Sequence, residues 1–263
     1  MTSCRMKILA VIAMTIDHAA KIIGQSGLMV IFPNMSLHTS YRIIELMEEI
    51  GRIAFPLFAF MIVEGTLKTR SMPRYIGRLA LFSVISEPFY YYAYNMKNAS
   101  VGGFFDSLSR LNFNNVFFTL MLGAIAIYIY QLLERKRSKK WLLLWIPISL
   151  IIVFIGGYVH CDYGMAGIIL IIALFFAKTK TQKIIVILVW SLGLYILGQA
   201  FNGFGFNLAQ VNVSSAMNCI CAALAGVLIL FYNGERGRTM KWSFYIYYPA
   251  HLFLLASLAS VLH

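Results

Sequence analysis

Long apolar segments alternate with short polar connections along almost the whole chain. A helix of about 20 apolar residues crosses the hydrocarbon core of a bilayer. Because lipid offers no hydrogen-bond partners, each segment must satisfy its own backbone groups, which favours helices. The pattern predicts an all-α polytopic bundle that forms one domain over residues 1–263, with nine spans at residues 6–24, 51–67, 76–95, 114–133, 141–158, 163–177, 183–200, 214–232 and 241–261.

Two segments need separate interpretation. Residues 38–50, HTSYRIIELMEEI, alternate apolar and polar positions at helical spacing and predict an amphipathic helix on the outer membrane surface. The amino terminus has Arg5 and Lys7 before an apolar run, as a signal peptide does. Charged residues interrupt the run before any small-residue cleavage site, so we expect this segment to be retained as the first span.

Composition supports the membrane assignment. Hydrophobic residues make up 60% of the chain and charged residues 12%, against about 25% charged in soluble domains. With the amino terminus inside and the carboxyl terminus outside, most basic residues lie in cytoplasmic loops. All but five of the 22 lysines and arginines then lie inside, the exceptions being Lys21, Arg42, Arg52, Lys97 and Arg110. This asymmetry accounts for the net charge of +12, so no nucleic-acid partner is predicted.

The cysteines predict neither a disulfide framework nor a metal site. They are few and scattered, and His160, Cys161 and Asp162 are adjacent, which is not a ligand spacing. We therefore expect no metal cofactor.

Several ionisable residues interrupt the apolar segments, where a charge costs about 2.5–3.5 kcal/mol at the bilayer centre. His18 lies eleven residues after Lys7, which is about 16 Å along a helix and about three full turns, so both share one face. His251 and Glu87 lie at similar depths in the last and third spans. We expect the three deep residues to converge on an interior cavity.

Their neighbours refine this picture. Asp17 points to another side of the helix and is expected to pair with Lys21 at i,i+4. Tyr247 lies one turn before His251, and Pro249 loosens the helix there. A single buried histidine or glutamate can also serve as a hydrogen-bonding post between helices, so a purely structural role stays open for each.

Other polar residues allow two interpretations. Arg52 and Glu64 lie near opposite ends of the second span and are either structural anchors or substrate contacts. Asn115 and Asp162 lie at outer helix ends, where such side chains often cap helices. The basic inner residues can likewise determine topology alone or bind a ligand.

Seven stretches together resemble the TraX family. They run in order from residue 16 to residue 252, and they read IDHAAKIIG, GRIAFPLFAFMIVEG, YIGRLALFSVISEPFY, NNVFFTLMLG, CDYGMAG, YNGERG and FYIYYPAHL.

The resemblance implies a multi-pass acetyltransferase of the bacterial cytoplasmic membrane. The family looks related to transmembrane acyl-CoA acyltransferases, many of which carry a basic residue, ten intervening residues and a histidine in the first span. Lys7 and His18 fit this spacing, with lysine where arginine is common. The best-known family role is N-acetylation of a pilin subunit. Cytosolic acetyl-CoA would be the donor, and a peptide amine or glycan hydroxyl on the outer side the acceptor.

This implied reaction assigns roles to the buried residues. His18 would be the general base or a transient acyl carrier. Asp17 or Glu87 would orient its ring, and Tyr248 or His251 would donate to the oxyanion. The inner residues expected to hold the coenzyme A phosphates are Lys7, Arg70, Arg74, Arg78, Arg236, Arg238 and Lys241. The residues expected to contact the acceptor are Arg52, Glu64, Asn115, Asp162, Tyr163 and Tyr248.

Two functions from other classes stay open. Buried histidines and carboxylates also form the proton relays of secondary transporters, although no inverted repeat is evident. A noncatalytic assembly factor for surface appendages is the third interpretation.

Overall fold

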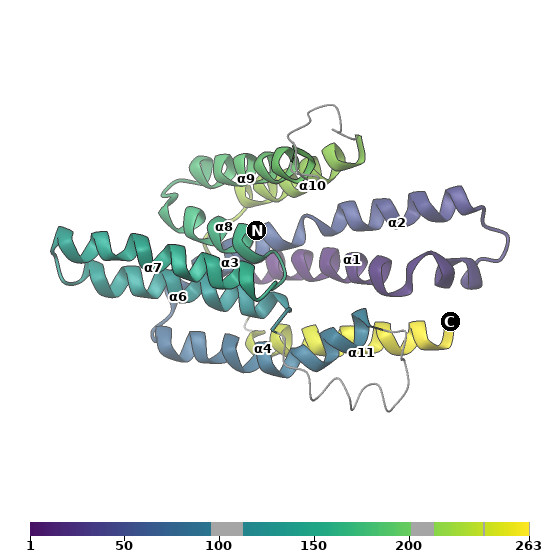
Figure 1. Ribbon diagram of the computed structural model, residues 1–263, viewed down its shortest axis with the longest axis horizontal. Coiled ribbons are helices and arrows are strands. Elements are labelled where there is room, and N and C mark those ends of the chain that lie inside the picture. The colour runs from purple at the N-terminus through teal and green to yellow at the C-terminus, as the bar shows by residue number, and fades with distance from the viewer. Residues whose placement is uncertain (96–112, 201–212, 239, 263) are drawn as a thin grey trace.

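The computed structural model describes residues 1–95, 113–200, 213–238 and 240–262, and within these ranges every regular element is a helix (Figure 1). The all-α prediction is therefore confirmed for this part of the chain. The predicted spans coincide with helices, most of them to within a few residues at each end. The helices are α1 (Ser3–Ile31), α2 (Leu37–Gly51), α3 (Ala54–Lys68), α4 (Met72–Tyr94), α6 (Val116–Glu134), α7 (Lys139–Tyr158), α8 (Gly164–Phe176), α9 (Lys180–Ala200), α10 (Val213–Leu230) and α11 (Lys241–Leu262).

The apolar helices indicate a membrane protein. Among the described residues, four segments are long and apolar enough to cross a bilayer, namely Leu37–Lys68, Val116–Glu134, Lys139–Tyr158 and Trp242–Leu262. Gly164–Phe176 and Cys219–Leu230 are apolar but shorter. The arrangement of nine spans with the amino terminus inside stays a prediction, and Lys97 and Arg110 lie outside the described residues.

Helix α1 extends beyond the predicted span at both ends. Thr2 caps it by accepting a hydrogen bond from the backbone N–H of Arg5. Gly24, where the predicted span ends, has φ +64° and interrupts the helical backbone before the chain continues helically to Ile31. Glycine adopts this conformation without a Cβ clash, so it permits the kink.

Helix α2, the predicted amphipathic helix, runs back along α1 (Figure 1). Gln25 of α1 donates to Ser40 Oγ of α2 at 3.1 Å. Closer to α3, a Cβ on Gly51 would lie 2.2 Å from the Asp17 Cβ, so only glycine allows this approach. The packing fixes Asp17 against the end of α2, while the location of α2 relative to a membrane stays a prediction.

Helix α3 forms the centre of the bundle and packs against α1, α6, α8 and α10. Phe55, Leu57 and Phe60 on this helix are almost fully buried. In Figure 1, α9 pairs with α10 on one side of this centre, and α4 pairs with α11 on the opposite side. The pairing of α11 with both α4 and α1 positions the buried histidines.

Glu87 does not join the histidines, so the expected convergence of three ionisable residues is wrong for this one. It is fully buried, and its carboxylate accepts from the backbone N–H of Asn114 at 3.0 Å and of Asn115 at 3.3 Å. The Asn115 side-chain amide also donates to it at 2.5 Å. Glu87 thus holds the start of α6 against α4, which is the structural role left open for it.

Replacing Glu87 with alanine is expected to lower the free energy of unfolding by about 3 kcal/mol, because one partly buried donor and two buried donors lose this acceptor at about 1 kcal/mol each. This corresponds to a fall in Tm of about 5–10 °C for a chain of this size. Thermal unfolding of the detergent-solubilised protein measures it. Glu134→Ala at the exposed end of α6 is the control. Equal Tm values for the two variants would contradict the role of Glu87 in holding α6 against α4.

Candidate active site

Two histidines meet where α1 and α11 pack together. His18 Nδ1 lies 2.7 Å from His251 Nε2, and the two ring planes differ by 9°. The side chains are 5% and 4% exposed, so water does not replace their contact. The histidine pair, as we call His18 and His251, therefore depends on its own hydrogen bond to offset the cost of burying two imidazoles.

Hydrogen-bond chemistry fixes the proton positions in the pair. His251 Nδ1 lies 3.0 Å from the carbonyl oxygen of Tyr247, which can only accept, so Nδ1 carries the proton. In a neutral ring, His251 Nε2 is then the acceptor, and His18 Nδ1 must donate to it. This leaves a lone pair on His18 Nε2, which makes no hydrogen bond to any described residue. The backbone carbonyl of Tyr247 thus sets the tautomer of His251, and His251 in turn sets the tautomer of His18. A hydrogen bond to one ring nitrogen of a histidine commonly determines the state of the other.

Aromatic residues enclose the pair. Tyr248 meets both rings edge-on, with centroids 6.0 Å from His18 and 5.5 Å from His251. Tyr94 of α4 meets His18 at 6.2 Å. Tyr247 stacks on His251 at 5.1 Å, and its hydroxyl bonds to Thr15 at 2.8 Å. These contacts hold the rings in one orientation inside an apolar wall.

Three buried polar atoms have no hydrogen-bond partner among the described residues, and all belong to α4 and α11: Arg78 Nε, Ser86 Oγ and Tyr248 Oη. Ser86 lies one turn from Phe82 and from Phe89, which contact Tyr245 and Phe253 of α11. It therefore faces α11. An unsatisfied buried polar group costs about 1–3 kcal/mol. A polar ligand that forms hydrogen bonds with these atoms would therefore stabilise the folded protein.

The end of this interface near the start of α1, which is predicted to be the inner end, is basic. The Lys7 ammonium lies 5.6 Å from the Phe244 ring centroid of α11, so Lys7 and His18 both face α11, as their spacing predicts. Arg236 contributes positive charge near Lys7. Arg78 is half-buried and interacts with Tyr245, whereas the side chains of Arg70, Arg74, Arg236 and Arg238 are exposed. The side chain of Lys241 lies outside the part of the protein that the structure describes.

A second polar group, the outer cluster, consists of Asp17, Lys21, Arg52, Asp162 and Tyr163. Lys21 pairs with Asp17 at 2.6 Å, as predicted. Arg52 interacts with Tyr163, and both Lys21 and Arg52 place positive charge near Asp162. Burial raises the pKa of Asp162 to about 6, and the Lys21 ammonium limits that rise. Asp162 is therefore mostly ionised at pH 7, which lies only about one pH unit above its pKa.

The geometry separates the other predicted site residues. Neither Asp17 nor Glu87 orients His18, because Asp17 pairs with Lys21 and Glu87 holds α6. Asn115 caps α6 by accepting from the backbone N–H of Phe117, which confirms its capping role. Helix α8 has no side-chain cap, so Asp162 does not cap it.

Glu64 lies away from the outer cluster, among lysines. Its carboxylate pairs with Lys68 at 2.8 Å and with Lys183 at 3.2 Å, and it accepts from the Tyr232 hydroxyl at 3.2 Å. Sequence reasoning missed Ser86, Tyr94 and this lysine grouping. A usable signal existed for Ser86, because it continues the i,i+4 stripe formed by Arg78 and Phe82.

These features define a helical membrane protein with a buried, hydrogen-bonded histidine pair and basic residues near the amino-terminal end of α1. A family model described as TraX protein matches residues 3–259. The chain belongs to the TraX family. It is similar to a probable fimbrial assembly protein, FimC of serogroup H1, from Dichelobacter nodosus, with 29% identity over 268 residues covering 96% of this chain and 93% of that protein. No solved structure matches the chain.

The proton arrangement predicts an unusual tautomer for His18. Ring-nitrogen NMR of histidine-labelled protein should show His18 protonated at Nδ1 rather than Nε2. His251→Phe, which keeps a flat ring but removes the acceptor, should release His18 to the other tautomer. The exposed His38 serves as an internal reference in both samples. Protonation of His18 at Nε2 in the unmodified protein would contradict the arrangement.

Proposed function

We propose that this protein is a membrane-embedded acyltransferase that moves an acetyl group from cytosolic acetyl-CoA to an acceptor on the outer side. The observation that carries the proposal is the histidine pair, which leaves a lone pair on Nε2 of the largely buried His18. A nitrogen of this kind suits a general base, which typically contributes a factor of about 10²–10⁴ in rate. The proposal includes the nine-span topology with the amino terminus inside.

The inner end of the α1, α4 and α11 interface fits the donor. Lys7 and Arg78 offer positive charge to phosphates of coenzyme A. Ser86 Oγ and Tyr248 Oη, for which the described part of the chain offers no hydrogen-bond partner by distance and angle, can bond to a ligand further along the same interface. The pantetheine arm carries amide groups that can satisfy such atoms. The thioester would then reach His18 from the inner side.

The reaction balances through these residues. His18 Nε2 takes the proton from the acceptor amine or hydroxyl as its nitrogen or oxygen bonds to the thioester carbon. His18 then returns that proton to the departing thiolate as the carbon–sulfur bond breaks. The Tyr248 hydroxyl donates to the carbonyl oxygen while negative charge develops there. Both ring nitrogens of His251 are already engaged, which favours Tyr248 over His251 for this role.

The outer cluster fits an amine acceptor. The carboxylates of Asp17 and Asp162 attract an ammonium group, while Lys21 and Arg52 hold these carboxylates in place. Asp162, with a pKa of about 6, is ionised at neutral pH and can accept a charge-assisted hydrogen bond from the arriving ammonium. The printed name of the fimbrial relative favours a subunit of a surface appendage as the acceptor. A glycan hydroxyl stays the alternative acceptor.

Removing the proposed base tests the reaction. His18→Ala is expected to lower transfer of labelled acetyl from acetyl-CoA to surface proteins by about 100-fold or more. Label incorporation is measured in native-host membranes with matched protein levels. His38→Ala, at an exposed position of α2, should keep full transfer. Full transfer by His18→Ala would remove His18 from the chemistry, and substrate uptake without any acyl-CoA would favour a transporter instead.

Lys7 tests the donor side separately. Lys7→Glu reverses a charge at the inner end, so the KM for acetyl-CoA should rise about tenfold or more while kcat changes less. Initial rates over a range of acetyl-CoA concentrations give both constants. Arg5→Glu, an exposed position two residues earlier, is the matched control. Equal KM values for the two variants would return Lys7 to a role in topology alone.

A further inference from the structure

A pocket of about 280 Å³ lies apart from the histidine pair, among α3, α9 and the segment after α10. We call it the lysine pocket, and its lining consists of Phe60, Glu64, Lys178, Lys180, Lys183, Tyr232, Asn233 and Gly234. Three lysines and one carboxylate line it, so its net charge is positive. None of these lysines belongs to the set expected to bind the donor.

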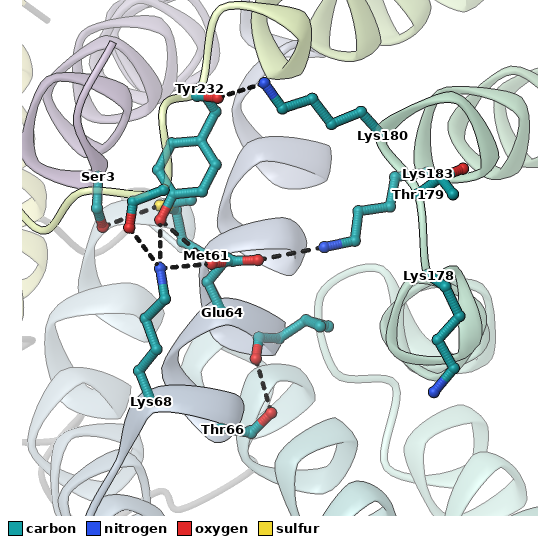
Figure 2. Close-up of polar contacts among 12 residues, drawn as sticks. Ser3, Met61, Glu64, Thr66, Lys68, Lys178, Thr179, Lys180, Lys183 and Tyr232 are labelled. Atoms are coloured by element: carbon teal, nitrogen blue, oxygen red, sulfur yellow. Dashed lines mark hydrogen bonds and ion pairs between the residues drawn. The ribbon is translucent and has the colours of Figure 1, made fainter.

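One carboxylate organises the wall of the pocket (Figure 2). Glu64 Oε1 pairs with Lys183, and Glu64 Oε2 pairs with Lys68 and accepts from Tyr232. Lys183 lies 4.9 Å from the Phe60 ring centroid, and Lys68 lies 5.2 Å from that of Tyr232. The aromatic faces therefore seat ammonium groups. This single carboxylate already pairs with two ammonium groups, so its one negative charge does not balance the lysines of the pocket.

The other two lysines supply the surplus charge. Lys180 Nζ donates to the carbonyl oxygens of Leu230 at 3.1 Å and Tyr232 at 2.6 Å, which leaves its third proton for a ligand. Lys178 is exposed, and its ammonium has no carboxylate partner among the described residues. Lys180 also begins α9, whose amino-terminal dipole favours an anion.

We infer that the lysine pocket binds the phosphate group of a phosphate ester. Three lysines line this cavity, and lysine ammonium groups suit phosphate oxygens, which accept charge-assisted hydrogen bonds. The volume lies just below the 300–1,000 Å³ of pockets that hold whole drug-sized ligands. It therefore suits a phosphate and its nearest atoms, either the nucleotide end of a coenzyme A donor or the headgroup of an anionic lipid. Binding of coenzyme A by this pocket depends on the proposed function, whereas binding of a lipid headgroup does not.

A pair of double variants tests the inference. Lys178→Gln/Lys180→Gln removes two charges from the pocket and keeps amide donors. Lys139→Gln/Lys140→Gln, the turn variant, removes two charges from the exposed first turn of α7, outside the pocket lining. Calorimetric titration with adenosine 3′,5′-bisphosphate measures the donor source. Native mass spectrometry of protein released from phosphatidylglycerol nanodiscs measures the lipid source.

The pocket variant should bind at least one of these probes about tenfold more weakly than the turn variant does, and the affected probe identifies the source. Adenosine without phosphate should bind neither protein measurably. Equal binding by the two double variants in both measurements would overturn the inference. His18→Ala should leave this binding unchanged, so failure of the pocket and failure of the proposed reaction are distinguishable.

Discussion

The hydrogen bond between His18 and His251 is the interaction on which the rest of the site depends. It connects residues 233 positions apart in the chain and joins α1 to α11 at a point almost closed to solvent. Without it, each helix would bury an imidazole with unsatisfied nitrogens, at a cost of about 1–3 kcal/mol per group. The same bond sets the proton on His18 Nδ1 and leaves the opposite nitrogen basic. The same hydrogen bond thus stabilises the packing of α1 against α11 and, in the proposed reaction, sets the tautomer of the base.

Charge is distributed around this contact in a way that suits a reaction crossing a membrane. The end of the α1 and α11 interface near the start of α1 carries Lys7, and the outer cluster carries Asp17 and Asp162 beside Lys21 and Arg52. An anionic donor and a cationic acceptor would therefore approach the histidine pair from opposite ends. In the proposed reaction, the apolar wall around the pair would limit the access of bulk water, which would otherwise compete with the acceptor for the thioester.

The sequence predicted the helices well because lipid leaves few alternatives to a helix. Most ends agree to within a few residues, while α1 extends further at both ends. The sequence also predicted the shared face of Lys7 and His18, since eleven residues make three turns. It did not predict the partner of Glu87, because depth along a helix does not specify direction. Adjacent residues point about 100° apart, so Ser86 faces α11 while Glu87 faces α6.

Other features depended on contacts between distant segments. The orienting partner of His18 turned out to be a second histidine, and no local pattern distinguished it from the nearby carboxylates. The lysine pocket was equally hidden, because Lys180 and Lys183 resemble any basic residues at the end of a span until Glu64 is placed beside them. Polar residues inside apolar segments were thus recognisable, but their pairing required the fold.

The most direct test of the central claim is a cryo-electron microscopy structure of the protein in nanodiscs with a nonhydrolysable acetyl-CoA analogue. The account predicts that the analogue enters between α1, α4 and α11 from the inner end. Its carbonyl carbon should leave room for one acceptor atom beside His18 Nε2, with that atom about 3–3.5 Å from the carbon and within hydrogen-bond reach of the nitrogen. Continuous side-chain packing around His18 with no analogue density reaching it, or a ring with Nε2 turned toward lipid, would contradict the account.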